Sequence, residues 1–161
     1  MRLFIALSVD TTPLKELRYE FKDVKGRFIE DSNFHMTLAF LGEVDECKID
    51  LIKNIIEKIP FTLKEIESEE VTTFREDTVV VKFKNHPQLI KYQRELTKEL
   101  DKNEIYFDKK PYKPHITIIR RSNEIISGEY NEIYKLTGIH LFSSKLTERG
   151  SIYKSLYKKT I

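Results

Sequence analysis

The sequence contains the same three-residue pattern twice, a histidine followed two positions later by a threonine. The two copies are His35–Thr37, with the sequence HMT, and His115–Thr117, with the sequence HIT. Each copy lies in a stretch that alternates like a β-strand, so its histidine and threonine share one face. A single pair of this kind is typical of a half-exposed strand. Because the pattern uses two of only four histidines and recurs in matching surroundings, it indicates a common chemical purpose.

Two histidines and two threonines around one small volume are suited to in-line displacement at phosphorus. A neutral imidazole removes a proton from the attacking oxygen, a protonated imidazole gives one to the departing oxygen, and the threonine hydroxyls donate hydrogen bonds to nonbridging oxygens. This chemistry needs no metal. The chain has no H-E-x-x-H motif or paired cysteines for zinc and no G-x-x-x-x-G-K-[ST] phosphate loop, so we expect no cofactor.

The elements that position the first pattern run strand, helix, loop, strand. Leu3–Val9 is an apolar run of strand length, and a helix is predicted after Asp10, with Pro13 in its first turn. The apolar stripe of this helix is Leu14, Leu17, Phe21 and Val24.

The second pattern is preceded by the same order of elements. Thr78–Phe83 is a predicted strand, Asn85 is a predicted helix cap, and the helix extends from Pro87 to about Lys102. A loop rich in lysine and proline leads to the strand Pro114–Arg121. The two halves therefore echo each other, which is consistent with an approximate twofold duplication.

The remaining segments favour an α+β fold with substantially antiparallel sheet. They are a helix at about Asp45–Lys58 and strands near Phe61–Glu67, Val71–Phe74, Ile133–Phe142 and Ser151–Tyr157. No linker divides the chain, so residues 1–161 are expected to form a single domain.

Four segments together resemble the 2H phosphoesterase superfamily, in particular its RNA 2′,3′-cyclic phosphodiesterases, also called 2′-5′ RNA ligases. HMTLAFLGEV, residues 35–44, resembles the first family signature, and KPHITIIR, residues 113–120, resembles the second. The opening RLFIAL and the closing LFSSKLTERGSIYKSL, residues 141–156, are similar to the ends of that branch. The similarity spans nearly the whole chain in the right order.

The resemblance implies a bilobed fold in which each lobe is a mainly antiparallel sheet with helices packed outside and the active site lies in the cleft between lobes. It implies hydrolysis of a 2′,3′-cyclic phosphate at an RNA or nucleotide end, leaving a 2′-phosphate. The catalytic histidines would be His35 and His115, and the phosphate-binding hydroxyls would be those of Thr37 and Thr117. The arginine that closes the second signature would be Arg120.

The residues at the end of the second signature differ from the family pattern, and strand alternation bears on the direction of Arg120. The family commonly has a leucine and a small residue where this chain has Ile118 and Ile119, which affects the local shape of the site. Strict alternation also places Arg120 on the face opposite His115, so Arg120 reaches a phosphate only if the strand ends or bulges there.

Aromatic residues near the two patterns are candidates for stacking on a base. Tyr112, in the loop before His115, is the preferred candidate, because the parity of Phe40 with Leu38 places Phe40 in the core. Small Ala39, on the face of His35, would leave room for a ligand. No role is assigned to His86 or His140.

The bulk composition does not by itself point to nucleic acid, since 28 basic residues nearly balance 26 acidic ones. A local basic surface is indicated by Lys109, Lys110, Lys113, Arg120 and Arg121. The single cysteine, Cys47, fits a reducing compartment and is interpreted as an incidental thiol. With no span-length apolar segment or cleavage site, we expect a cytoplasmic monomer without membrane contact.

Three functions stay open at this stage. The favoured one is opening of terminal 2′,3′-cyclic phosphates. The second uses the same cleft on a small cyclic nucleotide, an ADP-ribose cyclic phosphate or a 2′-5′ linkage, including the joining of RNA ends. The third is a non-catalytic module that binds RNA ends, against which the two histidines argue, because lysine or arginine would bind phosphate equally well.

Overall fold

The computed structural model describes all 161 residues and contains nine strands and three α-helices, with every strand pair antiparallel. In chain order the elements are β1 (Arg2–Val9), α1 (Thr12–Glu20), β2 (Arg27–Phe28), η1 (Asp31–Asn33), β3 (Met36–Glu43), η2 (Glu46–Lys48), α2 (Ile49–Lys58), β4 (Glu65–Phe74), β5 (Thr78–Phe83), α3 (Pro87–Lys102), β6 (His115–Arg120), β7 (Gly128–Glu129), β8 (Ile133–Thr147) and β9 (Gly150–Thr160). The elements η1 and η2 are short 3₁₀ helices.

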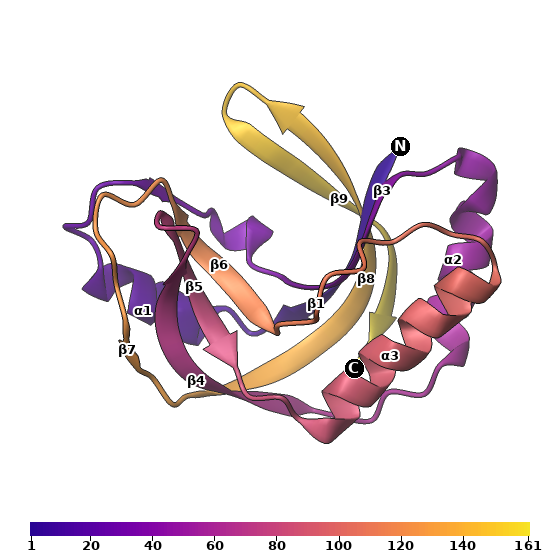
Figure 1. The fold of residues 1–161 in the computed structure, drawn as a ribbon, viewed down its shortest axis with the longest axis horizontal. Helices are drawn as coiled ribbons and strands as arrows, with labels where there is room; N and C mark the ends of the chain where they lie inside the picture. The colour runs from indigo at the N-terminus through magenta and orange to yellow at the C-terminus, as the bar shows by residue number, and fades with distance from the viewer.

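The nine strands form one continuous antiparallel sheet with a part in each half of the molecule, and we call these parts the first and the second sheet (Figure 1). The first sheet has the order β3-β1-β8-β9, and the second has the order β2-β6-β5-β4 with β7 also paired to β4. They are joined where Glu65–Glu67 of β4 pairs with Ile133–Lys135 of β8. In both halves a strand, a helix and an antiparallel neighbouring strand follow one another, as β1-α1-β3 and β5-α3-β6. The predicted α+β fold with a pseudo-twofold duplication is confirmed.

The helix of each strand–helix–strand unit lies beside the sheet of the other half. The helix α3 follows β5 of the second sheet but lies with α2 beside the first sheet (Figure 1). There the amide of Gln93 donates to the carbonyl of Leu38, and the hydroxyl of Tyr92 donates to the carbonyl of Ile56. The helix α1 follows β1 but lies on the side of the second sheet. None of the helices is long and apolar enough to cross a membrane.

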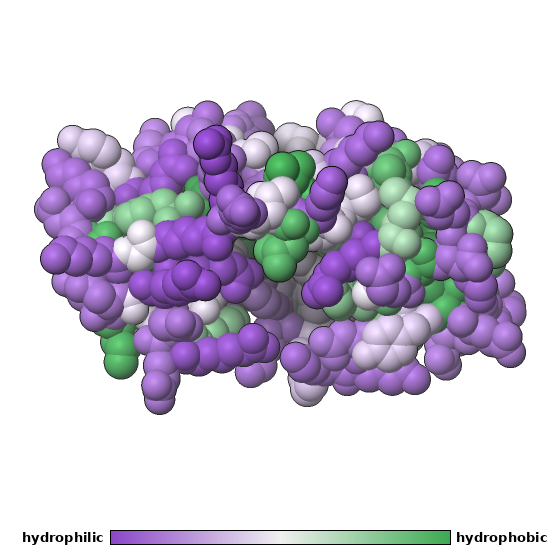
Figure 2. Space-filling model, turned by 90° about the horizontal axis from the view of Figure 1, so that it is seen from above, coloured by the Kyte–Doolittle hydropathy of each residue, from purple (hydrophilic) through white to green (hydrophobic).

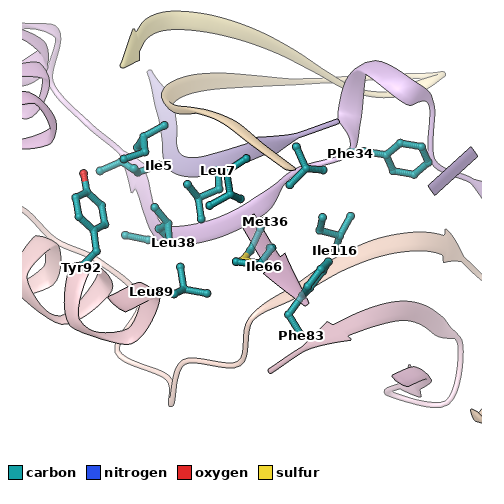
Figure 3. Packing of buried hydrophobic residues seen from close by; sticks show 14 of the residues in the cluster. Ile5, Leu7, Phe34, Met36, Leu38, Ile66, Phe83, Leu89, Tyr92 and Ile116 are labelled. Atoms are coloured by element: carbon teal, nitrogen blue, oxygen red, sulfur yellow. The ribbon is translucent and has the colours of Figure 1, made fainter. Parts of the chain in front are cut away.

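One core cluster of 35 buried residues runs through both halves. Figure 3 shows its members from α3, from β1 and β3, and from β5 and β6, including Leu89, Met36 and Ile116. Alternate residues of β1 point into this cluster, whereas Phe4 and Ala6 point to the other face and form a separate small cluster with Phe142. The first sheet therefore has an outer face covered by helices and an inner face left for the cleft.

A bulge interrupts β3 directly after Thr37. Ala6 of β1 lies opposite Thr37 and Ile5 lies opposite Ala39, so Leu38 is an extra residue in the ladder. Leu38 and Ala39 are consequently both buried in the main core, and Phe40 turns to the inner face, where it packs against the small cluster. The expectations that Ala39 shares the face of His35 and that Phe40 belongs to the core beside Leu38 are wrong, because both assumed strict alternation.

The same bulge occurs in β6, directly after Thr117. Val80 lies opposite Thr117 and Val79 lies opposite Ile119, so Ile118 is the extra residue. Ile118 and Ile119 are both fully buried, which explains two successive isoleucines in a strand that otherwise alternates. After the bulge, Arg120 is exposed.

Other element boundaries differ from the predictions in ways that the structure explains. The strand β4 is continuous from Glu65 to Phe74, where two strands were predicted. Strands β8 and β9 form a long hairpin that projects beyond the core (Figure 1), with a two-residue connection before Gly150 at φ +113°. The cap of α3 is His86, whose Nδ1 accepts from the amide of Gln88, rather than Asn85.

Candidate active site

The first pattern lies at the start of β3 on the inner face of the first sheet. His35 directly precedes the strand and Thr37 is its second residue. Both line a cavity of about 140 Å³, which also receives residues from β6, from the β2–η1 segment and from the β8–β9 hairpin. The lining residues are Phe4, Arg27, Ile29, Asn33, His35, Thr37, Thr117, Arg120, Leu146, Ser151 and Tyr153. Seen from above, the surface is hollowed between the two halves (Figure 2).

Aromatic rings surround His35. Its ring centroid lies 4.2 Å from that of Phe142 and 5.9 Å from that of Tyr153. Burial among these rings is the main cause that lowers the pKa of His35 to about 4, and the neighbouring His140, 6.3 Å away between ring centroids, contributes to this shift. The carbonyl of Asn33 opposes a smaller part of this shift in the His35 pKa. The Nδ1 atom of His35 is buried and makes no hydrogen bond of normal geometry.

The second histidine, His115, is the first residue of β6. This strand of the second sheet contacts β3 of the first sheet without pairing with it. Its Nδ1 lies 2.6 Å from the carbonyl of Lys113 and must donate, because a carbonyl only accepts. This bond fixes the tautomer and leaves Nε2 available to a ligand. Burial lowers the pKa of His115, and the charges of Arg120 and Arg75 lower it further, while the Lys113 carbonyl raises it.

The structure brings Thr117 and Arg120 to the cavity together with His35 and Thr37. His115 is not among the residues that line it, but alternation before the bulge places His115 on the face of Thr117. The bulge then returns Arg120 to this same face, which is the condition under which the sequence predicted that Arg120 reaches a phosphate. Its guanidinium supplies a fixed positive charge at the cavity.

Tyr112 lies elsewhere. Its hydroxyl is buried without a hydrogen-bond partner, and burial raises the pKa of Tyr112 above its usual range. The residue lines a different groove, beside the start of α3, together with Lys91 and Arg94. The structure therefore does not bring Tyr112 to the cavity that holds the two patterns. Of the predicted basic surface, Lys109 and Lys110 are paired with Asp101 and Asp108.

Sequence reasoning missed the residues that close the cavity from the other side. Arg27 donates from Nη2 to the carbonyl of Arg149 at 3.0 Å, and Asn33 donates from Nδ2 to the carbonyl of Ser151 at 3.0 Å. These bonds tie the hairpin to the β2–η1 segment. The resemblance of residues 141–156 to a family end was the only signal for this region, and it did not indicate that the hairpin reaches the site.

His140 was also missed and lies behind the cavity in a hydrogen-bonded row. Its Nε2 is 2.9 Å from Ser8 Oγ and its Nδ1 is 2.8 Å from Ser155 Oγ. Its ring stacks on Phe142 at 4.7 Å with an interplanar angle of 10°. Burial lowers the pKa of His140 and the charge of Lys158 lowers it further. His140 thus holds Phe142, which in turn packs against His35.

No three or more histidine, cysteine or acidic side chains gather where they could hold a metal ion. The single thiol, Cys47, is exposed, and its hydrogen bond to Asp45 raises the pKa of Cys47. An exposed thiol with a raised pKa has little thiolate character.

The chain matches the family described as "LigT like Phosphoesterase" over residues 7–81 and 83–153. It belongs to the LigT-like phosphoesterase family. The resemblance inferred from the two H-x-T patterns and the chain ends is confirmed.

Curated relatives of this family match over nearly their full length. The RNA 2′,3′-cyclic phosphodiesterase of Archaeoglobus fulgidus is 29% identical, with 97% of this chain and 98% of that protein covered. The protein of the same name from Escherichia coli is 26% identical, with 96% and 93% covered.

Solved structures share the LigT-like fold. A crystal structure described as a phosphoesterase has a TM-score of 0.85 at 22% identity and covers 99% of this chain and 97% of its own. The E. coli LigT structure complexed with 3′-AMP has a TM-score of 0.80 at 23% identity, with 99% and 97% covered.

Proposed function

We propose that this protein hydrolyses the 2′,3′-cyclic phosphate at the end of an RNA or a nucleotide and leaves a 2′-phosphate, with His35 and His115 as the paired general acid and base. The observation that carries the proposal is the equivalent placement of the two patterns. Each lies at the start of a strand, β3 or β6, each is followed by the same bulge, and Thr37 and Thr117 line one cavity.

The reaction is an in-line attack of water on phosphorus. One histidine removes a proton from the attacking water while the bond from phosphorus to the ribose O3′ breaks, and the other histidine gives a proton to O3′. Atoms and charges balance, since one water is consumed and a 3′-hydroxyl and a 2′-phosphate form. The hydroxyls of Thr37 and Thr117 and the guanidinium of Arg120 donate to the nonbridging oxygens as negative charge accumulates there.

The pKa values of both histidines are lowered, which favours the neutral imidazole. The neutral form is the one that a general base needs, whereas a general acid needs the protonated form. In the free protein near neutral pH, His35 and His115 are both uncharged, because burial disfavours their protonated forms. A bound cyclic phosphate brings a negative charge, which raises the pKa of an adjacent imidazole. Substrate binding thereby favours uptake of a proton from solvent by the histidine that acts as the acid. The two limbs of a bell-shaped pH profile belong to this coupled pair rather than to either residue.

The relatives support the substrate class. Curated members that match this chain over nearly their full length are named RNA 2′,3′-cyclic phosphodiesterases. The E. coli LigT structures include complexes with ATP and with 3′-AMP, so a protein of this fold accepts adenine nucleotides. The proposed reaction requires no metal, since paired imidazoles perform both proton transfers and Arg120 supplies the positive charge.

The test uses the purified full chain in EDTA with a short RNA that ends in a 2′,3′-cyclic phosphate. We expect a product heavier by one water, whose phosphate a phosphomonoesterase removes, and whose position is assigned as 2′ by comparison with synthetic 2′- and 3′-phosphate standards. A 3′-phosphate product would contradict cleavage of the bond to O3′. An unchanged substrate, or turnover only after metal is added, would contradict the paired-histidine reaction.

A further inference from the structure

The cavity has two chemically different parts. His35, Thr37, Thr117 and Arg120 supply the proton donors and the positive charge that suit a phosphate. The apolar residues of the lining are Phe4, Ile29, Leu146 and Tyr153. A phosphate is bound by hydrogen-bond donors and cations rather than by apolar side chains, so this second part must face another portion of the substrate.

The apolar part includes an organised aromatic wall beside His35. Across β3, β1 and β8, Phe40, Phe4 and Phe142 occupy one row of the inner face. The rings of Phe4 and Phe142 stack at 5.2 Å, and Tyr153 meets Phe4 edge-on at 4.9 Å. Phe4 is buried, whereas Tyr153 is only partly buried and lines the cavity. Tyr153 is therefore the ring of this wall that is most available to a ligand.

The β8–β9 hairpin presents Tyr153 together with a leucine. Ser144 pairs with Tyr153 and Leu146 pairs with Ser151, so Leu146 and Tyr153 lie diagonally across the two strands on one face. Both residues line the cavity. Leu146 is 81% exposed, which is unusual for a large apolar side chain that lies beside a polar site. A flat apolar ligand on this face of the hairpin would cover it.

Two polar side chains at this end are already engaged. Asn33 donates to the carbonyl of Ser151, and Arg27 donates to the carbonyl of Arg149. Tyr153 and Leu146 present an aromatic and an aliphatic surface, which contact the faces of a base without distinguishing its edges, and Ser151, opposite Leu146, lies beside them.

We propose that Tyr153 and Leu146, on the inner face of the β8–β9 hairpin, form a stacking subsite for the nucleobase of the nucleotide that carries the cyclic phosphate. This inference rests on the proposed function and deepens it. The subsite binds any of the four bases by stacking, so the protein discriminates little between terminal nucleotides. It also places base stacking on β9 rather than on Tyr112.

The experiment compares two substrates that differ only in the base. One is adenosine 2′,3′-cyclic phosphate, and the other is methyl riboside 2,3-cyclic phosphate, which has the reacting ring but no base. Stacking on an aromatic side chain gives roughly 5- to 100-fold in affinity for each base. We expect the wild-type kcat/KM to favour the adenosine substrate by such a factor, and the four nucleoside 2′,3′-cyclic phosphates to differ by less than about tenfold from one another.

Tyr153→Ala should remove most of this preference by lowering kcat/KM for the adenosine substrate while leaving that for the base-free substrate nearly unchanged. Tyr153→Phe keeps the ring and should keep the preference. Leu146→Ser should reduce the preference more weakly, and its side chain is too exposed for the change to affect folding. Tyr106→Ala is the control, because Tyr106 is 68% exposed and does not line the cavity.

Equal losses on both substrates in Tyr153→Ala would overturn the inference, since Tyr153 would then act only by supporting His35. Binding of 2′-AMP and of ribose 2-phosphate is measured by calorimetry in parallel. If no cyclic substrate is hydrolysed but Tyr153→Ala weakens binding of 2′-AMP selectively, the proposed function fails and the subsite stands. If the wild type hydrolyses both substrates equally well, the proposed function stands and the subsite fails.

Discussion

Phe40 and Arg120 occupy the same position in the two halves of the molecule. Each is the third residue after the threonine of its H-x-T pattern, and each is turned to the cleft side by a bulge that follows that threonine. Phe40 extends the aromatic row and lies under the guanidinium of Arg2, 5.0 Å from its ring centroid, whereas Arg120 lines the cavity. The equivalent position therefore carries an aromatic ring in the first half of the molecule and a cation in the second half.

Arg120 should be the cation that binds the phosphate, because the bulge places it with Thr117. Arg120→Ala should lower kcat/KM for a 2′,3′-cyclic phosphate about 10- to 100-fold, as expected for losing a hydrogen bond to a charged group. Arg120→Lys keeps the charge but not the paired geometry of the guanidinium, so it should recover only part of the rate. Steady-state kinetics of the three proteins measure both effects.

The matched control is Arg121→Ala. Arg121 follows in the chain, has φ +54° and does not line the cavity. Its removal should leave kcat/KM within about twofold of the wild type. A larger loss in Arg121→Ala than in Arg120→Ala would mean that the bulge does not direct Arg120 to the substrate.

Thr37 and Thr117 should act in the same way on the nonbridging oxygens. Replacing either by valine keeps the shape and removes the hydroxyl, and each change should lower kcat by roughly 10- to 100-fold with little effect on the thermal unfolding midpoint. Rates at saturating substrate are the measurement. A strong effect of Thr37→Val with none of Thr117→Val would show that only one half binds the phosphate.

The pKa of His35 predicts how stability depends on pH. His35 has a pKa of about 4 in the folded protein and about 6.5 when unfolded, so between these values the unfolded chain binds more protons. The free energy of unfolding should therefore decrease as the pH falls from 6.5 towards 4. From pH 7.5 to pH 5 the contribution of His35 is about 2 kcal/mol.

Urea unfolding of the wild type and of His35→Gln at pH 7.5 and pH 5 measures this contribution. The variant should lose about 2 kcal/mol less over this range, because glutamine does not titrate. Equal losses in the two proteins would show that the imidazole of His35 is not held in its neutral form.

The sequence was sufficient for the features that depend on short-range pattern. Leu3–Val9, Thr78–Phe83 and the helix Pro87–Lys102 lie where apolar periodicity and proline placed them, and the two H-x-T patterns lie at the starts of two strands, one in each half of the molecule. These elements have a buried face and an exposed face, which leaves a readable period in the sequence.

What the sequence did not reveal depends on long-range register. The bulges at Leu38 and Ile118 move Phe40 to the inner face of its sheet and Arg120 to the cavity, and they follow from pairing with β1 and β5 rather than from local preference. The hairpin tip has no buried face, so no alternation marked Leu146 as a strand residue, and its approach to His35 requires the tertiary fold.

The paired-histidine reaction is tested most directly by His35→Ala and His115→Ala, assayed separately in EDTA on an RNA that ends in a 2′,3′-cyclic phosphate. Each variant should keep its fold by circular dichroism and lose at least about a hundredfold in kcat, because each proton transfer contributes about 10² to 10⁴ to the rate. The pH profile of each variant should lose one limb of the wild-type bell. Near-full activity in either variant would contradict the proposal that the two histidines work as a pair.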